Sequence, residues 1–88
     1  MPLKLNISSR AMKFIEALPA KQFKQIMNKV LKLLTNPTPH DHEQLKGYAY
    51  KRVDVGEYRI IYAFDELEVR VSYIGKRNDD EVYKALSR

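Results

Sequence analysis

Hydrophobic positions recur at two different spacings, which divide the chain into a helical part and a strand part. At the start, Leu3, Leu5 and Ile7 alternate with polar residues, and this alternation predicts a short strand. In the segment that follows, apolar residues recur every three or four positions, the period of a helix with one apolar side. After Gly47 the alternation returns and continues to Ile74. The pattern therefore predicts a strand, then helices, then a group of strands.

Two helices are expected in the first half. Ser8 or Ser9 can cap a first helix that extends through Leu18, and Pro19 interrupts it because proline is poorly tolerated inside a helix. A second helix follows, since proline suits a first turn. Its end is expected at the NPTP run of residues 36–39, because proline and the residue before it both resist the helix. Its apolar stripe consists of Phe23, Ile26, Met27, Val30, Leu33 and Leu34.

Three strands are expected in the second half. Short turns at Gly56-Glu57 and Asp65-Glu66 require the neighbouring strands to be antiparallel. Together with the first strand, this predicts an α+β fold in which a two-helix hairpin covers one face of an antiparallel sheet, in the order βααβββ. A short C-terminal helix follows. The three expected strands are Tyr50–Val55, Tyr58–Phe64 and Val69–Ile74.

Composition limits the class of protein. A chain of 88 residues leaves room for one domain, over residues 1–88, with one modest core. The absence of cysteine excludes disulfides and thiolate chemistry. No apolar run is long enough to cross a membrane, and the alternating start does not have the pattern of a signal peptide. We therefore expect a soluble, cytoplasmic protein.

The net charge of +5 is unevenly distributed, and most of the surplus lies in residues 1–44, chiefly as lysines. A basic helix can bind a polyanion, because each neutralised phosphate releases counterions. It can equally be the solvated side of an amphipathic helix, and charge alone favours this second interpretation. Both interpretations stay open at the level of sequence.

Arginines gather on the expected strands. By strand alternation Val53 and Val55 face the helices, so Arg52 points to the other face of the sheet. Arg59 lies on the next strand and Arg77 follows the last one, so several guanidiniums can converge there. An arginine fork matches phosphate oxygens in pairs and stabilises negative charge in a transition state. The alternative for each single arginine is cross-strand pairing with an acid.

The run LKGYAYKRVDVGEYRIIYAF, followed later by VSYIGKRNDDEVY, resembles the RelE/ParE superfamily of bacterial toxins, and the element order agrees along nearly the whole chain. The segments LKG at residues 45–47 and GEYRIIY at residues 56–62 are shared across that superfamily. The ending GKR at residues 75–77, with EVY at residues 81–83, is similar to the RelE-type branch, the ribosome-dependent messenger RNA interferases. The resemblance implies a toxin of a type II toxin–antitoxin system.

By this resemblance, Arg59 and Arg77 match the catalytic arginines of the family and Tyr83 matches its catalytic tyrosine. The family also has two basic residues on the strand before the turn. Arg52 takes the first of these positions, and the second falls on Asp54, an acid. Asp54 could instead pair with Arg52 and hold it in place.

A different placement of the gap offers Lys51 for the first basic position and Val53 for the second. With either placement, one basic group of the family is missing.

The activity implied is cleavage of messenger RNA by its own 2′-hydroxyl, which attacks the scissile phosphate without a metal or other cofactor. The phenol of Tyr83 is a weak base at neutral pH, but nearby cations favour its phenolate. His40 and His42 lie in a loop that the family does not use for chemistry. A His-x-His pair without further ligands is a weak metal signal, so we interpret both as surface residues.

The resemblance also implies partners. The ribosome would position the codon in its A site, and a cognate antitoxin would cover the toxin in a hetero-oligomer. Two alternatives remain: a ParE-type inhibitor of DNA gyrase that cleaves nothing, and a degenerate relative that only binds antitoxin or nucleic acid, which Asp54 favours. The expected RNA- or ribosome-binding residues are Lys21, Lys24, Lys32, Lys51 and Lys76.

Overall fold

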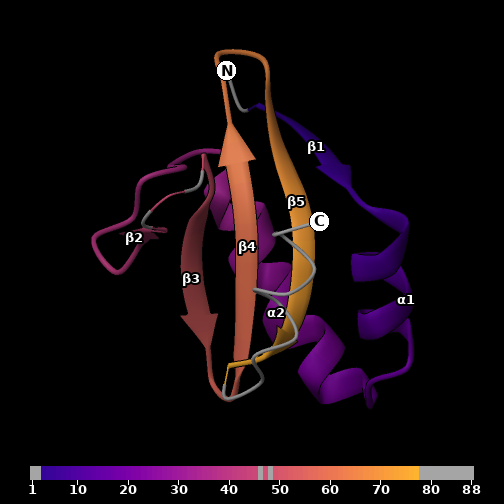
Figure 1. The fold of residues 1–88 in the computed structure, drawn as a ribbon. Coiled ribbons are helices and arrows are strands. Elements are labelled where there is room, and N and C mark those ends of the chain that lie inside the picture. The colour runs from indigo at the N-terminus through magenta and orange to yellow at the C-terminus, as the bar shows by residue number, and fades with distance from the viewer. Residues whose placement is uncertain (1–2, 46, 48, 78–88) are drawn as a thin grey trace.

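The computed structural model describes residues 3–45, 47 and 49–77 (Figure 1). Every helix and strand expected within these residues is present, and one short strand, β2, was not expected. The predicted C-terminal helix lies outside the described residues. The elements are β1 (Lys4–Ile7), α1 (Ser9–Glu16), α2 (Ala20–Leu33), β2 (Glu43–Gln44), β3 (Lys51–Val55), β4 (Tyr58–Phe64) and β5 (Glu68–Lys76).

The strands form one five-stranded sheet in the order β1-β5-β4-β3-β2. β3, β4 and β5 are antiparallel neighbours, as their short turns predicted. β1 pairs with β5 in parallel, so the sheet is mixed rather than wholly antiparallel. Hydrophobic alternation predicts a strand but carries no information about its direction, because both ladders have the same side-chain period.

Both helices pack against one face of the sheet; in Figure 1, α2 lies behind the strands and α1 lies to the right of β5. α1 begins where the Ser8 side chain accepts a hydrogen bond from the Ala11 amide at 3.2 Å, and α2 begins directly after Pro19. Val53 is buried in the core between the layers and Val55 packs against it, so the predicted orientation of β3 is confirmed. The buried residues of this core are Ala11, Ile15, Ile26, Val30, Leu33, Val53, Ile60, Tyr62, Val69, Val71 and Ile74.

The side of the sheet opposite the helices is called the far face here, and it contains the side chains that alternate with the core residues on β3 and β4. A second, smaller apolar cluster lies on it, where Leu45 and Ile61 are buried and Tyr50 and Tyr73 pack against them. Strand alternation places Arg52, Asp54 and Arg59 on this same face.

A β-bulge in β5 determines which of its side chains face the helices and which lie on the far face. Ile61 pairs with Tyr73 and Tyr62 pairs with Val71, so Ser72 is the extra residue. Val71 therefore faces the helices while Tyr73 faces the opposite side. The bulge lies where the chain leaves β1 for α1, because the Ser8 hydroxyl donates to the Ser72 carbonyl at 2.8 Å. No helix within the described part of the chain is long and apolar enough to span a membrane.

Candidate functional site

The structure places two of the expected arginines, Arg52 on β3 and Arg59 on β4, on the far face. Arg59 pairs with Asp54 in the β3–β4 ladder and with Gly75 in the β4–β5 ladder. Arg77 directly follows β5, its side chain is exposed, and its amide donates to the Glu57 carbonyl at 2.9 Å. Arg59 and Arg77 therefore lie at the same end of the sheet, beside the β3–β4 turn. Arg52, Arg59 and Arg77 are called the arginine cluster below.

Arg59 forms a two-point ion pair with Asp54. Its Nε donates to Asp54 Oδ1 at 2.8 Å and its Nη2 donates to Oδ2 at 3.3 Å. The side chain of Arg59 is only 14% exposed, so solvent screens this pair less than a surface pair. The hypothesis that Asp54 pairs with Arg52 is wrong, because cross-strand register sets Asp54 opposite Arg59.

The carboxylate that pairs with Arg52 is supplied by β2, the strand that sequence analysis missed. Arg52 Nε donates to Glu43 Oε2 at 3.0 Å, and Arg52 Nη2 also contacts this oxygen. Glu43 stands directly opposite Arg52 in the β2–β3 ladder. Within the described residues, Arg77 has no ion pair or side-chain hydrogen bond. Its guanidinium thus differs from those of Arg52 and Arg59, each of which faces a carboxylate.

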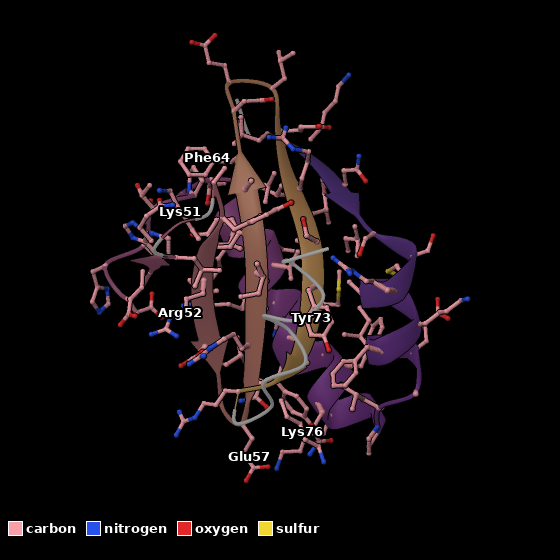
Figure 2. All side chains as sticks on the ribbon, in the orientation of Figure 1. Lys51, Arg52, Glu57, Phe64, Tyr73 and Lys76 are labelled. Atoms are coloured by element: carbon pink, nitrogen blue, oxygen red, sulfur yellow. The ribbon has the colours of Figure 1, made fainter. Side chains whose placement is uncertain are left out.

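The structure does not place the expected lysines with the arginine cluster. Lys51 lies on the helix side of β3, with its Nζ 5.7 Å from the Phe64 ring centroid and donating to Gln44 Oε1 (Figure 2). Lys76 pairs with Tyr58, which packs against the main core, and so points to the helix side of β5. The sheet therefore separates these lysines from the arginines. The exposed lysines Lys21, Lys24 and Lys32 lie on α2, which covers the face opposite the far face.

One arginine that sequence analysis did not single out also reaches the far face. Arg10, on α1, donates from Nε to the Ser72 carbonyl at 2.9 Å. Its guanidinium carbon lies 5.3 Å from the centroid of the Tyr73 ring, which is the geometry of a cation–π contact. Helical periodicity indicates only that Arg10 is off the apolar stripe. The contacts of Arg10 depend on the bulge at Ser72, which cannot be recognised from the alternation of hydrophobic residues.

Two groups with clearly shifted pKa values, Asp65 and Tyr62, lie away from the arginine cluster. The Leu67 amide, the Arg70 guanidinium and the Glu68 amide hold the pKa of Asp65 at about 2, in the β4–β5 turn. Burial raises the pKa of Tyr62 to about 12. Both groups keep one protonation state near neutral pH, so neither is suited to proton transfer there.

The histidines give no support to a metal site. His42 Nδ1 lies 2.6 Å from the Pro39 carbonyl, a contact within the loop. Within residues 3–45, 47 and 49–77, no group of three or more His, Asp or Glu side chains is placed to hold a metal ion. Tyr83, the expected catalytic tyrosine, lies outside the described residues.

Comparison with known proteins links this chain and its fold to one group. Residues 5–81 match the family model of the ParE toxin of the type II toxin–antitoxin system parDE. The search among curated proteins found no match.

Solved structures share the fold at low sequence identity. A mutant of the E. coli toxin RelE in the free state has a TM-score of 0.81 and 24% identity, covering 99% of this chain and 96% of that one. The archaeal RelE–RelB complex from Pyrococcus horikoshii has a TM-score of 0.77 and 21% identity, covering 88% and 97%. The E. coli RelE mutant in complex with an antitoxin RelBc peptide has a TM-score of 0.76 and 24% identity, and the match covers 97% of this chain and 94% of that one.

Because the family model spans most of the sequence, the chain belongs to the ParE toxin family of type II toxin–antitoxin systems, within the RelE/ParE superfamily.

Proposed function

We propose that this toxin is a ribosome-dependent endoribonuclease that cleaves messenger RNA. The observation that carries the proposal is the placement of Arg52 and Arg59 on one face of the sheet, with Arg77 at the same end as Arg59. Three guanidiniums near one surface favour a phosphodiester ligand, because each fork matches two phosphate oxygens and stays charged at neutral pH.

The chemistry assigned to this site is attack of the RNA 2′-hydroxyl on the adjacent phosphate. The bond from the 2′-oxygen to phosphorus forms, the bond to the 5′-oxygen breaks, and the proton lost by the hydroxyl balances the proton gained by the leaving oxygen. Arg77 is the candidate for stabilising the extra negative charge of the transition state. Tyr83, by its match to the family tyrosine, is the candidate for proton transfer.

RNA binding at this site requires an exchange of partners. The phosphate has to compete with Asp54 for Arg59 and with Glu43 for Arg52, because both carboxylates occupy positions that phosphate oxygens would take. Such competition weakens binding by the isolated toxin. Positioning of the message by the ribosome would compensate, because it removes much of the entropic cost of bringing the RNA to the site.

A cognate antitoxin is the second proposed partner. RelE structures that share this fold were solved in complex with RelB antitoxins, including the one with the RelBc peptide. By analogy, an antitoxin segment would cover the far face and block access to the arginine cluster.

A ParE-type inhibitor of DNA gyrase is the second candidate function, and the Asp54–Arg59 pair favours it. An arginine held at two points by a carboxylate is suited to maintaining structure rather than to binding a phosphate. The family model that matches the chain is also the one of ParE toxins. In this alternative, Arg77 and Tyr83 have no catalytic task.

An in vitro translation reaction separates the two candidates. We expect the toxin to cut ribosome-bound message at defined codon positions, seen by mapping the new RNA ends, and to leave gyrase activity unchanged. Arg77→Ala and Tyr83→Phe should each slow this cleavage by about 10²–10⁴-fold, because one removes transition-state charge and the other removes a proton donor and acceptor.

Lys13→Ala also removes one positive charge, at an exposed residue of α1 that belongs to neither the arginine cluster nor the expected ribosome-binding lysines. It is the matched control and should cleave at close to the wild-type rate. Gyrase-dependent DNA breakage without message cleavage would establish the second candidate. Normal cleavage by both Arg77→Ala and Tyr83→Phe would show that the site lies elsewhere.

A further inference from the structure

Arg10 is held in position before any ligand arrives. Its Nε is fixed by the Ser72 carbonyl, and its guanidinium lies against the Tyr73 ring. An arginine with one donor anchored and its plane supported by an aromatic ring loses less side-chain freedom on binding than a free one. Arg10 is nevertheless exposed, and no described residue accepts a hydrogen bond from its two terminal nitrogens. These nitrogens can therefore bind a ligand.

Tyr73 connects Arg10 with the arginine cluster. Its ring lies directly over Gly75, since a Cβ built at residue 75 would come within 2.6 Å of Tyr73 Cε1. Gly75 is in turn the partner of Arg59 in the β4–β5 ladder. Arg10, Tyr73, Gly75 and Arg59 thus form a row across α1, β5 and β4. Figure 2 shows Tyr73 on β5, between α1 and β4.

A pocket of about 240 Å³ beside Arg10 has the character of an anion site. Two of its lining residues, Arg10 and Arg70, are cationic, and no carboxylate lines it. Arg70 is engaged by Asp65 and Glu68, each of which accepts a hydrogen bond from its Nη1. The charge available to a ligand therefore comes mainly from Arg10. The lining residues are Asn6, Ser8, Arg10, Arg70, Val71 and Ser72.

We propose that Arg10 is a phosphate-binding residue that holds the backbone of single-stranded RNA beside the arginine cluster. The ligand class follows from the chemistry: a guanidinium fork with two terminal nitrogens available matches a pair of phosphate oxygens. Arg59 and Arg10 stand at the two ends of this row. An RNA strand that is bound at Arg59 can therefore continue across β5 and reach Arg10 on α1. This inference rests on the proposed function, because the ligand is the same RNA. Arg10 binds and positions the strand, and the chemistry remains with the arginine cluster and Tyr83.

Fluorescence anisotropy with a labelled, unstructured single-stranded RNA oligonucleotide tests the proposal over a series of salt concentrations. Arg10→Gln should weaken binding roughly tenfold and reduce the salt slope by about 0.7, the value for one lost phosphate contact on a single strand. Arg10→Lys should keep the slope but recover only part of the affinity, because a lysine has no fork. Lys13→Gln removes the same charge from an exposed residue of the same helix and should change neither quantity.

Several results would overturn the proposal. Equal effects of Arg10→Gln and Lys13→Gln would mean that only net charge matters. A lower melting temperature of Arg10→Gln with unchanged RNA affinity would mean that Arg10 only fastens α1 to β5. Absence of RNA binding by the wild type, or displacement of RNA by an acidic peptide at lower concentration than by unlabelled RNA, would assign the site to a protein partner.

Failure of the proposed function is distinguishable from failure of this inference. If the wild type does not cleave message in translation reactions but Arg10→Gln still loses RNA affinity and salt slope, the endoribonuclease assignment fails and the role of Arg10 stands. If the wild type cleaves and Arg10→Gln binds RNA like the wild type, the role of Arg10 is rejected and the assignment stands.

Discussion

Asp54 and Glu43 determine how much of the arginine charge a ligand can use. Asp54 holds Arg59 at two points, and Glu43 contacts Arg52 through Nε and Nη2. An ion pair of this kind fixes the guanidinium but also occupies the atoms that would bind phosphate. Both acids therefore act on the proposed chemistry through the arginines, without contacting the RNA themselves.

Asp54→Asn should make Arg59 a better phosphate ligand. The amide keeps a hydrogen-bond acceptor for Arg59 but removes the competing charge, so RNA affinity should rise by up to roughly fivefold, the equivalent of about 1 kcal/mol. Anisotropy with the same RNA probe measures this change. Glu57→Gln, on the adjacent turn, is the control for net charge. It removes one negative charge, and the Glu57 carboxylate forms no ion pair with an arginine among the described residues. A decrease in affinity for Asp54→Asn would show that the pair positions Arg59 for its ligand.

At the scale of elements, a few polar side chains fix the loops and turns that connect the helices and strands. The hydroxyl of Tyr62, on β4, donates to the Pro37 carbonyl at 2.7 Å and so ties the loop after α2 to the centre of the sheet. Asp65 organises the turn between β4 and β5, where its Oδ1 accepts from the amides of Leu67 and Glu68 and its Oδ2 accepts from Arg70. Neither contact is visible as a sequence pattern.

Tyr62→Phe should destabilise the fold by about 0.5–1.5 kcal/mol, because the partly buried Pro37 carbonyl loses its hydrogen-bond donor. For a domain of this size each kcal/mol corresponds to a melting temperature roughly 4–8 °C lower. Thermal unfolding followed by circular dichroism measures the shift. Tyr58→Phe, on the same strand and facing the same core, has no hydroxyl hydrogen bond among the described residues and should change stability much less. Equal shifts for the two variants would rule out a role for the hydrogen bond.

Asp65 should make the stability of the fold depend on pH in the acid range. Its folded pKa of about 2 lies below the ordinary value of 3.8, so its contribution is fully present above about pH 4 and is lost as the pH falls towards 2. Melting temperatures of wild type and Asp65→Asn should therefore differ most above pH 4 and converge near pH 2. Glu66→Gln, on the same turn, is the control for charge. A difference that stays constant over this range would mean that ionisation of Asp65 is irrelevant.

At the scale of the whole molecule, the sheet separates two basic surfaces. The arginine cluster lies on and beside the far face, whereas the exposed lysines lie on α2, which covers the opposite face of the sheet. One straight RNA strand cannot contact both surfaces. If both are functional, the toxin has to lie between two separate segments of RNA, and the proposed ribosomal partner would have to supply them.

Reversal of Lys21, Lys24 and Lys32 together to Glu should weaken association with ribosomes and reduce its salt dependence by roughly one unit per lost phosphate contact. Sedimentation with ribosomes over a salt series measures the slope. Affinity for the short RNA probe should remain nearly unchanged, because the probe binds on the other side of the sheet. The double variant Lys4→Glu with Lys13→Glu alters exposed lysines outside α2. It measures how much the salt dependence changes for each reversed charge that makes no specific contact. An unchanged slope would assign the α2 lysines to ordinary solvation.

The sequence by itself determined the helices and strands of the described residues other than β2, the two layers and the orientation of β3. Those features depend on local spacing: apolar period, the cap at Ser8, the prolines and the two short turns. Strand alternation also placed Arg52 and Arg59 on one face, because side-chain direction follows from parity alone. The family resemblance added their proposed roles.

Only the tertiary structure decided the direction of β1, the existence of β2 and the partners of each arginine. These depend on which strands become neighbours and in what register, and residues far apart in sequence set both. Glu43 contacts Arg52 because β2 joins the edge of the sheet, and Asp54 contacts Arg59 because they stand opposite in the ladder. Arg10 contacts Tyr73 because the extra residue at Ser72 reverses the alternation of β5 and turns the Tyr73 side chain to the far face. No local pattern in α1 contains that information.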